Sequence, residues 1–223
     1  MSILETKDVA YRYADAERDE YCLKNINFSF EKGKCYAIKG ASGSGKTTLL
    51  SLISGLESKY EGQVLYNGKD IKTLNLDKYR NSDIGIVFQS YNLLPHLTAA
   101  ENIMLSMDIN GKKVQDKKLK AVELIEQVGL KKSLADRRVL KLSGGEQQRI
   151  AIARSLSYDP DIILADEPTG NLDTQTENDI MKIFSELADA GKCVIVVTHS
   201  ENVVRHVDDV FFLNNTNLSN ALT

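Results

Sequence analysis

Residues 35–55 have the sequence CYAIKGASGSGKTTLLSLISG: a short apolar run, a glycine-rich loop, and a run of helical composition. The loop, Gly40–Thr47, fits the pattern GxxxxGK[ST], in which backbone N–H groups surround phosphate oxygens. In that pattern the lysine, here Lys46, reaches the β and γ oxygens, and the hydroxyl of Thr47 takes a Mg²⁺ position. A glycine loop can also be a plain flexible turn, but its place between a strand and a helix favours a phosphate loop.

Three further apolar runs, residues 84–88, 162–165 and 194–197, are nearly continuous rather than alternating. Such runs are typical of strands buried on both faces of a parallel sheet with helical crossovers. The first third of the chain instead shows short runs near residues 3–9 and 26–30, and a turn signal at Asn67-Gly68. This part predicts further strands with little helix.

Residues 90–159 show a different sequence pattern, in which apolar residues recur at helical spacing among many lysines. We expect a helical insertion there, and one further helix over residues 174–190 that ends at Gly191. The chain is then a single domain, 1–223, in which 1–89 and 160–223 form the core and 90–159 the insertion. The tail, residues 214–223, shows no pattern and is expected to be frayed.

Two adjacent carboxylates, Asp166 and Glu167, end one of the buried apolar runs. Like charges side by side are unfavourable unless something compensates them, and a bound Mg²⁺ would do so. The natural division gives Asp166 to the metal and Glu167 to an attacking water. The alternative is an ordinary solvated acidic pair at a strand end.

Gln89 and His199 also follow buried runs. Gln89 offers an amide to the metal or the water, and His199 stands where the γ-phosphate of a nucleotide on such a sheet would lie. His96 and His206 are expected to have structural roles only. The sequence has no asparagine-lysine-x-aspartate motif for guanine recognition, which favours adenine as the base of the nucleotide.

The stretch LSGGEQQR, residues 142–149, opens another helix with two glycines, although glycine is a poor helix former. Ser143 and Glu146 form a capping box, which explains those two residues but not Gly144 and Gly145. A bare helix N-terminus with a hydroxyl is an anion site. A second phosphate site means either two nucleotides per chain or one nucleotide shared between chains.

Taken together, GASGSGKT, Gln89, LSGGEQQR, ILADEPTGNLD and His199, in this order, resemble the nucleotide-binding subunits of ATP-binding cassette (ABC) transporters. The resemblance covers almost the whole chain. It implies a P-loop NTPase fold of the α/β class, with a RecA-like parallel-sheet core, an antiparallel β subdomain and a helical subdomain insertion.

The resemblance also implies a head-to-tail homodimer that hydrolyses ATP with Mg²⁺. Lys46, Gln89, Glu167 and His199 would be catalytic, and Thr47, Gln89 and Asp166 would hold the metal. Signature residues would bind the partner's ATP, and Asp173 would lie at the dimer seam. The remaining ATP contacts would come from Tyr13, stacked on adenine, and from the phosphate loop. Tyr11, which is expected on the same strand face as Tyr13, is the competing aromatic. In full, the expected ATP-binding residues are Tyr13, Gly40, Ser42, Gly43, Ser44, Gly45, Lys46, Thr47 and Thr48, with Ser143, Gly144, Gly145 and Glu146 acting in trans.

Finer details of the sequence, including FQSYNLLPHLTAAEN and DEPTGNLD, look most like the MacB, LolD and FtsE branch. That branch implies a membrane permease with an extracytoplasmic domain, and a place on the inner face of the membrane. Alternatives are an FtsE-like regulator of cell-wall enzymes and an ABC ATPase without a permease. Two departures weaken assignment to one member: RRVLK before the signature lacks a tyrosine-proline, and the chain stops soon after its last expected strand.

Composition argues against several other classes. The 223 residues carry a net charge of −3, so they lack the excess of positive charge typical of a dedicated nucleic-acid binder, which disfavours but does not exclude a DNA or RNA partner. The three cysteines are widely spaced and form no metal set, so we expect reduced thiols in the cytosol. No run of 18 apolar residues and no signal peptide is present, so action at a membrane would need another chain.

The segment after Gln89 joins a core strand to the insertion, so contact between Gln89 and a γ-phosphate could rotate the insertion as a rigid body. An apolar face in this segment is a candidate for docking the membrane subunit, and packing inside the helical subdomain is the alternative. Its residues are Tyr91, Leu93, Leu94 and Leu97.

Overall fold

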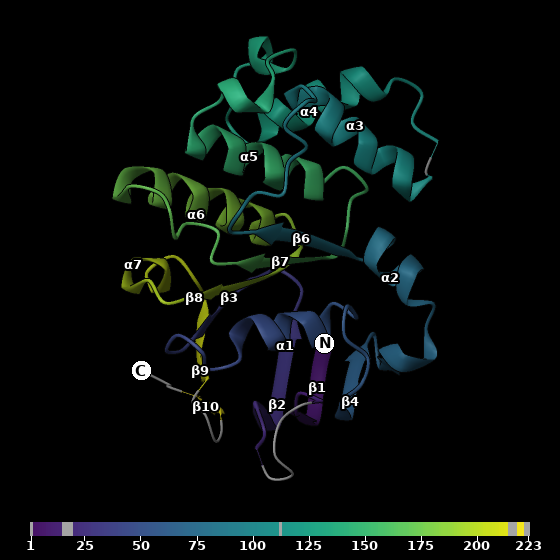
Figure 1. Cartoon of the computed structure of the whole chain (residues 1–223), viewed down its shortest axis with the longest axis vertical. Helices are drawn as coiled ribbons and strands as arrows, with labels where there is room; N and C mark the ends of the chain where they lie inside the picture. Colours follow the sequence, from purple (N-terminus) through teal and green to yellow (C-terminus); the bar gives the residue numbers. More distant parts are fainter. Residues whose placement is uncertain (1, 15–19, 112, 214–217, 221–223) are drawn as a thin grey trace.

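Two β-sheets carry the fold of the computed structural model, which describes residues 2–14, 20–111, 113–213 and 218–220 (Figure 1). The larger sheet has the strand order β10-β9-β3-β8-β7-β6, parallel except for the edge strand β10. Its strands are β3 (Lys34–Lys39), β6 (Ile84–Phe88), β7 (Ile162–Asp166), β8 (Cys193–Thr198), β9 (Asp209–Leu213) and β10 (Leu218–Asn220). The smaller, antiparallel sheet has the order β2-β1-β4-β5, from β1 (Ser2–Tyr11), β2 (Leu23–Glu31), β4 (Glu61–Tyr66) and β5 (Lys69–Asp70).

The parallel strands are covered on both faces, as their continuous apolar runs predict. Because side chains alternate along a strand, Ile162 and Leu164 of β7 enter the core shared with α1 (Lys46–Ile53) and the antiparallel sheet. Ile163 and Ala165 enter the opposite core, shared with α6 (Thr174–Asp189) and the helices of the insertion. The sheet therefore separates two hydrophobic cores.

The helices form two groups around the larger sheet. In Figure 1, α1 lies between the two sheets, and α3, α4 and α5 lie beyond α6 on the other side. These three helices all fall between residues 90 and 159: α3 (Ala99–Asn110), α4 (Lys117–Gln127) and α5 (Gly144–Ser155). The remaining elements are α2 (Leu76–Ser82), α7 (Glu201–Val204) and the short 3₁₀ turns η1 (Ile71–Thr73), η2 (Lys132–Leu134) and η3 (Val139–Lys141).

The structure adds two elements that were not expected and corrects two expectations. Helix α2 was not expected, and it lacks an apolar period because Tyr79 is its buried residue. Strand β9 was not expected, since most of its residues are only half-buried. Tyr13 lies beyond the end of β1, so it does not share a strand face with Tyr11. Part of the tail, residues 218–220, pairs with β9 rather than fraying, and residues 214–217 and 221–223 lie outside the described residues.

Candidate functional site

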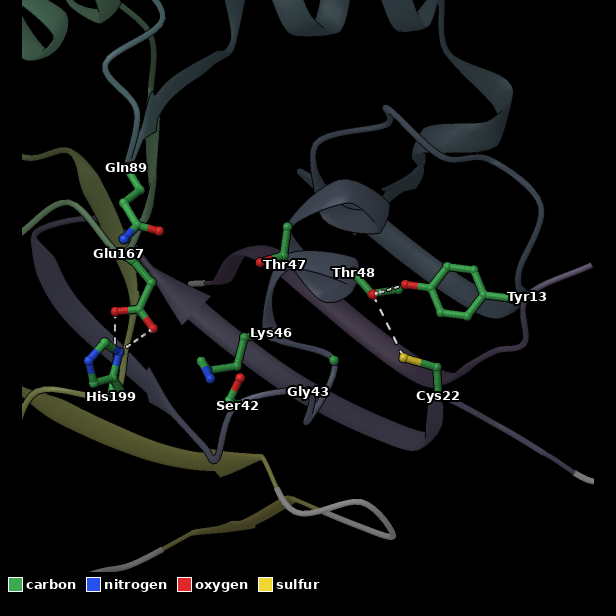
Figure 2. Close-up of a pocket in the computed structure, with 11 residues that line it drawn as sticks. Tyr13, Cys22, Ser42, Gly43, Lys46, Thr47, Thr48, Gln89, Glu167 and His199 are labelled. Atoms are coloured by element: carbon green, nitrogen blue, oxygen red, sulfur yellow. Dashed lines mark hydrogen bonds and ion pairs between the residues drawn. The ribbon is translucent and has the colours of Figure 1, made fainter. Parts of the chain in front are cut away.

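A cleft of about 720 Å³ lies at the carboxyl edge of the parallel sheet, where β3, β6, β7 and β8 end together (Figure 2). Loops that leave parallel strands at one edge converge, which is why residues far apart in the sequence meet here. Most residues expected at an ATP site are present. The lining residues are Tyr13, Cys22, Ser42, Gly43, Gly45, Lys46, Thr47, Thr48, Gln89, Glu167 and His199.

The phosphate loop presents its backbone to this cleft. Gly43 has φ +78° and would place a Cβ in open space, while a Cβ on Gly45, at φ +92°, would lie 2.8 Å from Leu23. A left-handed backbone favours glycine, and here it leaves N–H groups approachable. Gly40 and Ser44 do not line the cleft: a Cβ on Gly40 would lie 2.4 Å from the Ser44 Oγ, so the serine side chain points inward.

Lys46 is a buried cation, 8% exposed, and its Nζ donates to the carbonyl oxygens of Gly40 (2.8 Å) and Ala41 (2.9 Å). No ion pair among the described residues involves Lys46. Buried charges are normally paired with an opposite charge. A cation held by two neutral acceptors beside open backbone N–H groups fits an anionic ligand, as a nucleotide phosphate would be.

The expected metal ligands Thr47 and Asp166 lie together, with the Thr47 Oγ1 donating to the Asp166 Oδ1 at 3.3 Å. Burial raises the pKa of Asp166, with the neighbouring Glu167 adding to the effect. In the described residues no cluster of three or more His, Cys, Asp or Glu side chains could hold a metal. Mg²⁺ sites commonly use one carboxylate together with substrate phosphates, so the Thr47 and Asp166 pair fits such a site.

Glu167 and His199, expected to act on water and phosphate separately, are hydrogen-bonded to each other. The Glu167 Oε1 lies 2.9 Å from the His199 Nδ1, and the His199 backbone N–H donates to Oε2 at 3.3 Å. Glu167 also has φ +46°, an unusual conformation that often marks functional sites. With Nδ1–H donating to the carboxylate, His199 can offer a second donor at Nε2 only as the imidazolium.

Gln89 reaches the same cleft from the end of β6, and its amide lies close to the loop after Glu167. A Cβ on Gly170 of that loop would approach the Gln89 Nε2 to 3.1 Å. His206, by contrast, lies outside the cleft, where its Nε2 is 3.1 Å from the Asn178 Oδ1, in agreement with a structural role.

Tyr13 closes the far end of the cleft in Figure 2, 48% exposed, with its hydroxyl 2.6 Å from the Thr48 Oγ1. The rings of Tyr13 and Tyr11 form a T-shaped pair, with ring centroids 5.1 Å apart. Cys22 was not expected here. Its Sγ lies 3.7 Å from the Thr48 Oγ1, and no sequence pattern marked it.

A second cleft of about 350 Å³ surrounds the start of α5, and it shares no lining residue with the first. It brings the signature together with Asp173, the N-cap of α6. Hydrogen bonds from Thr176 lower the pKa of Asp173. The lining residues are Ser143, Gly144, Gly145, Glu146, Arg149, Asn171, Leu172, Asp173, Thr176 and Asp179, of which only the first four and Asp173 were expected.

The signature begins α5 with the capping box that the sequence predicts. The Ser143 Oγ accepts from the Glu146 N–H at 3.3 Å, and the Glu146 carboxylate accepts from the Ser143 N–H at 2.7 Å. The Ser143 O–H proton is left free to donate to an anion. The Glu146 carboxylate is occupied by this capping hydrogen bond. Its negative charge would repel a phosphate, so Glu146 itself does not favour phosphate binding.

The glycines of the signature have a packing reason that the sequence did not reveal. A Cβ on Gly145 would lie 2.6 Å from the Thr176 Cγ2, and one on Gly144 would lie 3.0 Å from the Tyr91 hydroxyl. Both contacts are within the same chain. Close packing of α5 against α6 therefore favours glycine at 145, and the Tyr91 hydroxyl leaves little room for a side chain at 144, besides any approach of a phosphate.

A phosphate loop at the edge of a doubly covered parallel sheet, with a carboxylate pair at the same edge, defines a P-loop nucleotide-binding protein. The sequence profile of the "ABC transporter" family matches residues 23–170. The chain belongs to the ABC transporter family, as an ATP-binding subunit.

Individual relatives agree with this assignment. The chain is 45% identical over 209 residues to YclH of Bacillus subtilis, an uncharacterized ABC transporter ATP-binding protein, covering 93% of this chain and 92% of YclH. It is 39% identical over 216 residues to LolD of Francisella tularensis, the ATP-binding protein of a lipoprotein-releasing system, covering 95% and 93%. The dimeric structure of the ABC transporter cassette MJ0796 superposes with a TM-score of 0.88 at 36% identity, covering 99% of both chains.

The two explanations of Gly145 can be separated. Gly145→Ala should destabilise the fold by about 1–3 kcal/mol, because the new methyl overpacks against Thr176. Thr176→Ser removes the opposing methyl and keeps the hydroxyl that binds Asp173. We expect the double variant Gly145→Ala/Thr176→Ser to recover most of the lost stability in urea unfolding, and no recovery would contradict the packing explanation.

Asp166→Asn should raise the melting temperature of the ligand-free protein by a few degrees at neutral pH. Burial raises the pKa of Asp166, so the carboxylate penalises the folded state above that pKa, and the penalty fades as pH falls through it. The gain should therefore shrink in acid. Asp136→Asn, at an exposed residue paired with Lys118, is the matched control and should show no gain. A lower melting temperature in Asp166→Asn would contradict the inference that the buried Asp166 carboxylate destabilises the ligand-free fold.

Proposed function

We propose that this chain hydrolyses ATP in a homodimer in which the first cleft of one copy faces the second cleft of the other. The observation that carries this proposal is that one chain has two separate clefts that share no lining residue. The first holds a buried lysine hydrogen-bonded to carbonyl oxygens and a carboxylate, and the second holds the start of α5. The cassette of MJ0796 forms a dimer, and a second structure of it is a dimer bound to ADP and Pi.

In the proposed reaction the phosphate-loop backbone and Lys46 bind the β- and γ-phosphates, and Tyr13 stacks on adenine. Glu167, held by His199, accepts a proton from the attacking water or orients it. Thr47, Asp166 and Gln89 would hold Mg²⁺, which supplies charge neutralisation at the transferred phosphoryl group. Ser143 and the N–H groups of Gly144 and Gly145 on the partner stabilise the developing charge.

Glu167→Gln should lower ATP hydrolysis by roughly 10² to 10⁴ while ATP binding stays intact, because the amide cannot accept the proton. Phosphate release and ATP binding are both measured on the purified protein. Glu123→Gln, at an exposed carboxylate of α4, is the matched control and should keep full turnover. Near-normal hydrolysis by Glu167→Gln would remove Glu167 from this role.

The shared site has its own test in the Glu167→Gln background. Light scattering should show a dimer with ATP and a monomer without it, since two nucleotides bridge the copies. Adding Ser143→Arg should abolish dimerisation and leave ATP binding to the monomer intact. A Glu167→Gln protein that stays monomeric at saturating ATP would contradict the shared site.

We further propose that the dimer drives a membrane permease of the MacB or LolD type, and so acts at the inner face of the membrane. The likeness to LolD at 39% identity supports this branch. Among the described residues, none of the helices combines the length and the apolar composition of a membrane-spanning segment. An FtsE-like regulator and an ABC ATPase without a permease are the alternatives. The neighbouring gene can distinguish these possibilities. If it encodes a permease with few transmembrane segments and a large external domain, it favours a MacB- or LolD-type system over an ATPase without a permease.

Leu94 is the best probe of the expected docking face. Leu93 packs against the helical core and Tyr91 turns its hydroxyl toward Gly144, whereas Leu94 is 47% exposed. Leu94→Glu should abolish co-purification with the permease while ATP binding and melting temperature stay unchanged. Ile109→Glu is the control, because Ile109 lies on α3 and is 63% exposed, and this variant should still co-purify with the permease. Retained co-purification by Leu94→Glu would exclude this face.

A further inference from the structure

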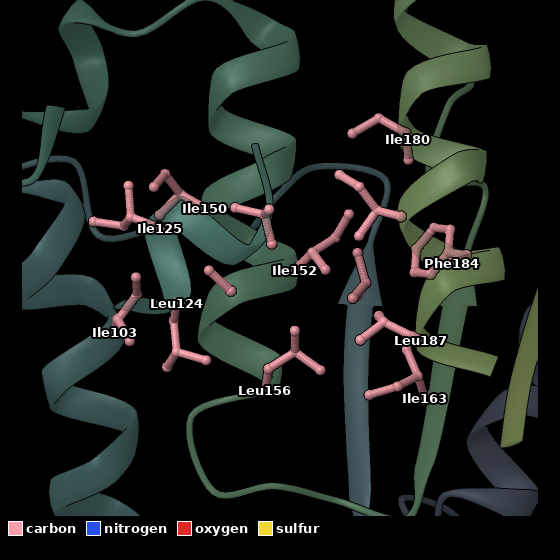
Figure 3. Close-up of a cluster of buried hydrophobic side chains, with 14 of the residues drawn as sticks. Ile103, Leu124, Ile125, Ile150, Ile152, Leu156, Ile163, Ile180, Phe184 and Leu187 are labelled. Carbon is pink, nitrogen blue, oxygen red and sulfur yellow. The ribbon is translucent and has the colours of Figure 1, made fainter. Parts of the chain in front are cut away.

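Helix α6 carries a carboxylate on its buried face, where the helical pattern predicts an apolar residue. Glu177, Ile180, Phe184 and Leu187 recur at helical spacing on this face. The last three lie in the core that α6 shares with α5 and the parallel sheet (Figure 3). Glu177 is only 9% exposed. Because a buried carboxylate costs folding free energy unless hydrogen bonds compensate it, its partners indicate what it does.

Each oxygen of the Glu177 carboxylate accepts a hydrogen bond from a different segment of the chain. Oε1 accepts from the Thr169 hydroxyl at 3.1 Å, and Oε2 accepts from the side-chain amide of Asn202 at 3.1 Å. Glu177 belongs to none of the ion pairs formed between described residues. A carboxylate has acceptor sites on both oxygens, so Glu177 can join two donors that belong to separate elements.

The first donor, Thr169, belongs to the loop that carries Glu167. The Gly170 N–H donates to the Glu167 carbonyl at 3.2 Å, and the Leu172 N–H donates to the Thr169 carbonyl at 3.0 Å. Thr169 therefore lies within two overlapping turns. Glu167 has a left-handed backbone, which a residue other than glycine keeps only where its surroundings fix it. A fixed Thr169 side chain helps to keep this loop, and with it the Glu167 carboxylate, in one position.

The second donor, Asn202, belongs to α7, which begins shortly after His199. The Ser200 hydroxyl accepts from the Asn202 N–H at 3.2 Å, and the Ser200 N–H donates to the Thr198 hydroxyl at 3.0 Å. The Asn202 side-chain amide also donates to the Asn178 Oδ1 at 2.6 Å. His199 is thus held between the end of β8 and a short helix that is hydrogen-bonded to α6.

Glu177 therefore connects, from the protein interior, the two segments whose side chains meet in the cleft. In the cleft, the Glu167 Oε1 lies 2.9 Å from the His199 Nδ1, and the His199 side chain is 66% exposed. Water competes for such an exposed hydrogen bond, so its net contribution is small. The two bonds of Glu177 join buried or half-buried side chains, where water competes less. The interior contacts are thus the stronger constraint on the spacing of the two segments.

We propose that Glu177 is a positioning residue for ATP hydrolysis, which holds the Glu167 loop and the His199 segment in register. Glu177 does not line the first cleft, so it acts through Glu167 and His199 rather than on the nucleotide. This role rests on the ATP hydrolysis proposed above. Loss of the Glu177 bonds lowers turnover and leaves ATP binding unchanged, because Lys46 and the phosphate loop are untouched.

The test compares Glu177→Met with Glu177→Gln in hydrolysis of ATP with Mg²⁺ by the full chain. Glu177→Met keeps the side-chain length but loses both acceptors, so kcat should fall about tenfold while KM for ATP stays within about twofold. Glu177→Gln can keep both bonds, because its oxygen accepts from Asn202 and its Nε2 donates to the Thr169 hydroxyl oxygen. Its kcat should stay within about threefold of the unmodified protein. Glu186→Met, at an exposed carboxylate of the same helix, is the matched control and should keep full turnover.

A second comparison separates positioning from a general loss of structure. In protein that already carries His199→Ala, adding Glu177→Met should change single-turnover hydrolysis by less than about twofold, because the pair that Glu177 positions is already broken. Thr169→Val covers the case in which Glu177→Met does not fold. It keeps the shape of the side chain, removes one donor and should lower kcat about fivefold, whereas Thr169→Ser should not.

The outcomes distinguish this role from the proposed function. If the unmodified protein hydrolyses no ATP, the proposed function itself is wrong. If it hydrolyses ATP and the folded Glu177→Met and Thr169→Val variants keep its kcat, the proposed function stands and the positioning role is overturned. An equal loss of turnover from Glu177→Met with and without His199→Ala would also overturn it.

Discussion

The carboxyl edge of the parallel sheet is the constraint on which the rest of the molecule depends. Strands β3, β6, β7 and β8 are buried on both faces, so their register is fixed by two hydrophobic cores. Each strand ends at the same edge, and each delivers a polar group there: the phosphate loop, Gln89, Asp166 with Glu167, and His199. Apolar packing of the strands determines the position of the cleft, and the residues at and just after the strand ends determine its chemistry.

The second cleft follows from a different constraint, the close packing of α5. Its N-terminus lies so close to α6 that a Cβ at residue 145 would meet Thr176 at 2.6 Å, and a Cβ at residue 144 would meet the Tyr91 hydroxyl at 3.0 Å. The same lack of side chains leaves the N–H groups of the helix approachable. Packing is therefore the internal reason for the two glycines, and approach of a partner's ATP is the proposed external reason. The loop from Glu167 to Asp173 joins the two clefts along the chain.

The sequence predicted the elements whose signals are local. The phosphate loop, the buried strands and the capping box each depend on neighbours within a few positions, and all are found. It did not predict α2, whose buried residue Tyr79 gives no period, or β9, whose exposure is mixed. Contacts between distant segments were also missed. Cys22 beside Thr48, Thr176 beside Gly145 and Arg154 on Tyr91 exist only once the chain is folded.

The electrostatics of the first cleft explain why its parts suit a bound nucleotide better than an empty cleft. Lys46 is buried with only carbonyl partners, and Asp166 is a carboxylate whose pKa burial raises beside a second carboxylate. Each group carries a desolvation cost in the ligand-free protein. A phosphate chain would offset the cost at Lys46, and a divalent cation would offset the cost at Asp166. Neither ligand alone would offset both costs, so under the proposed function the nucleotide and the cation are expected to bind together.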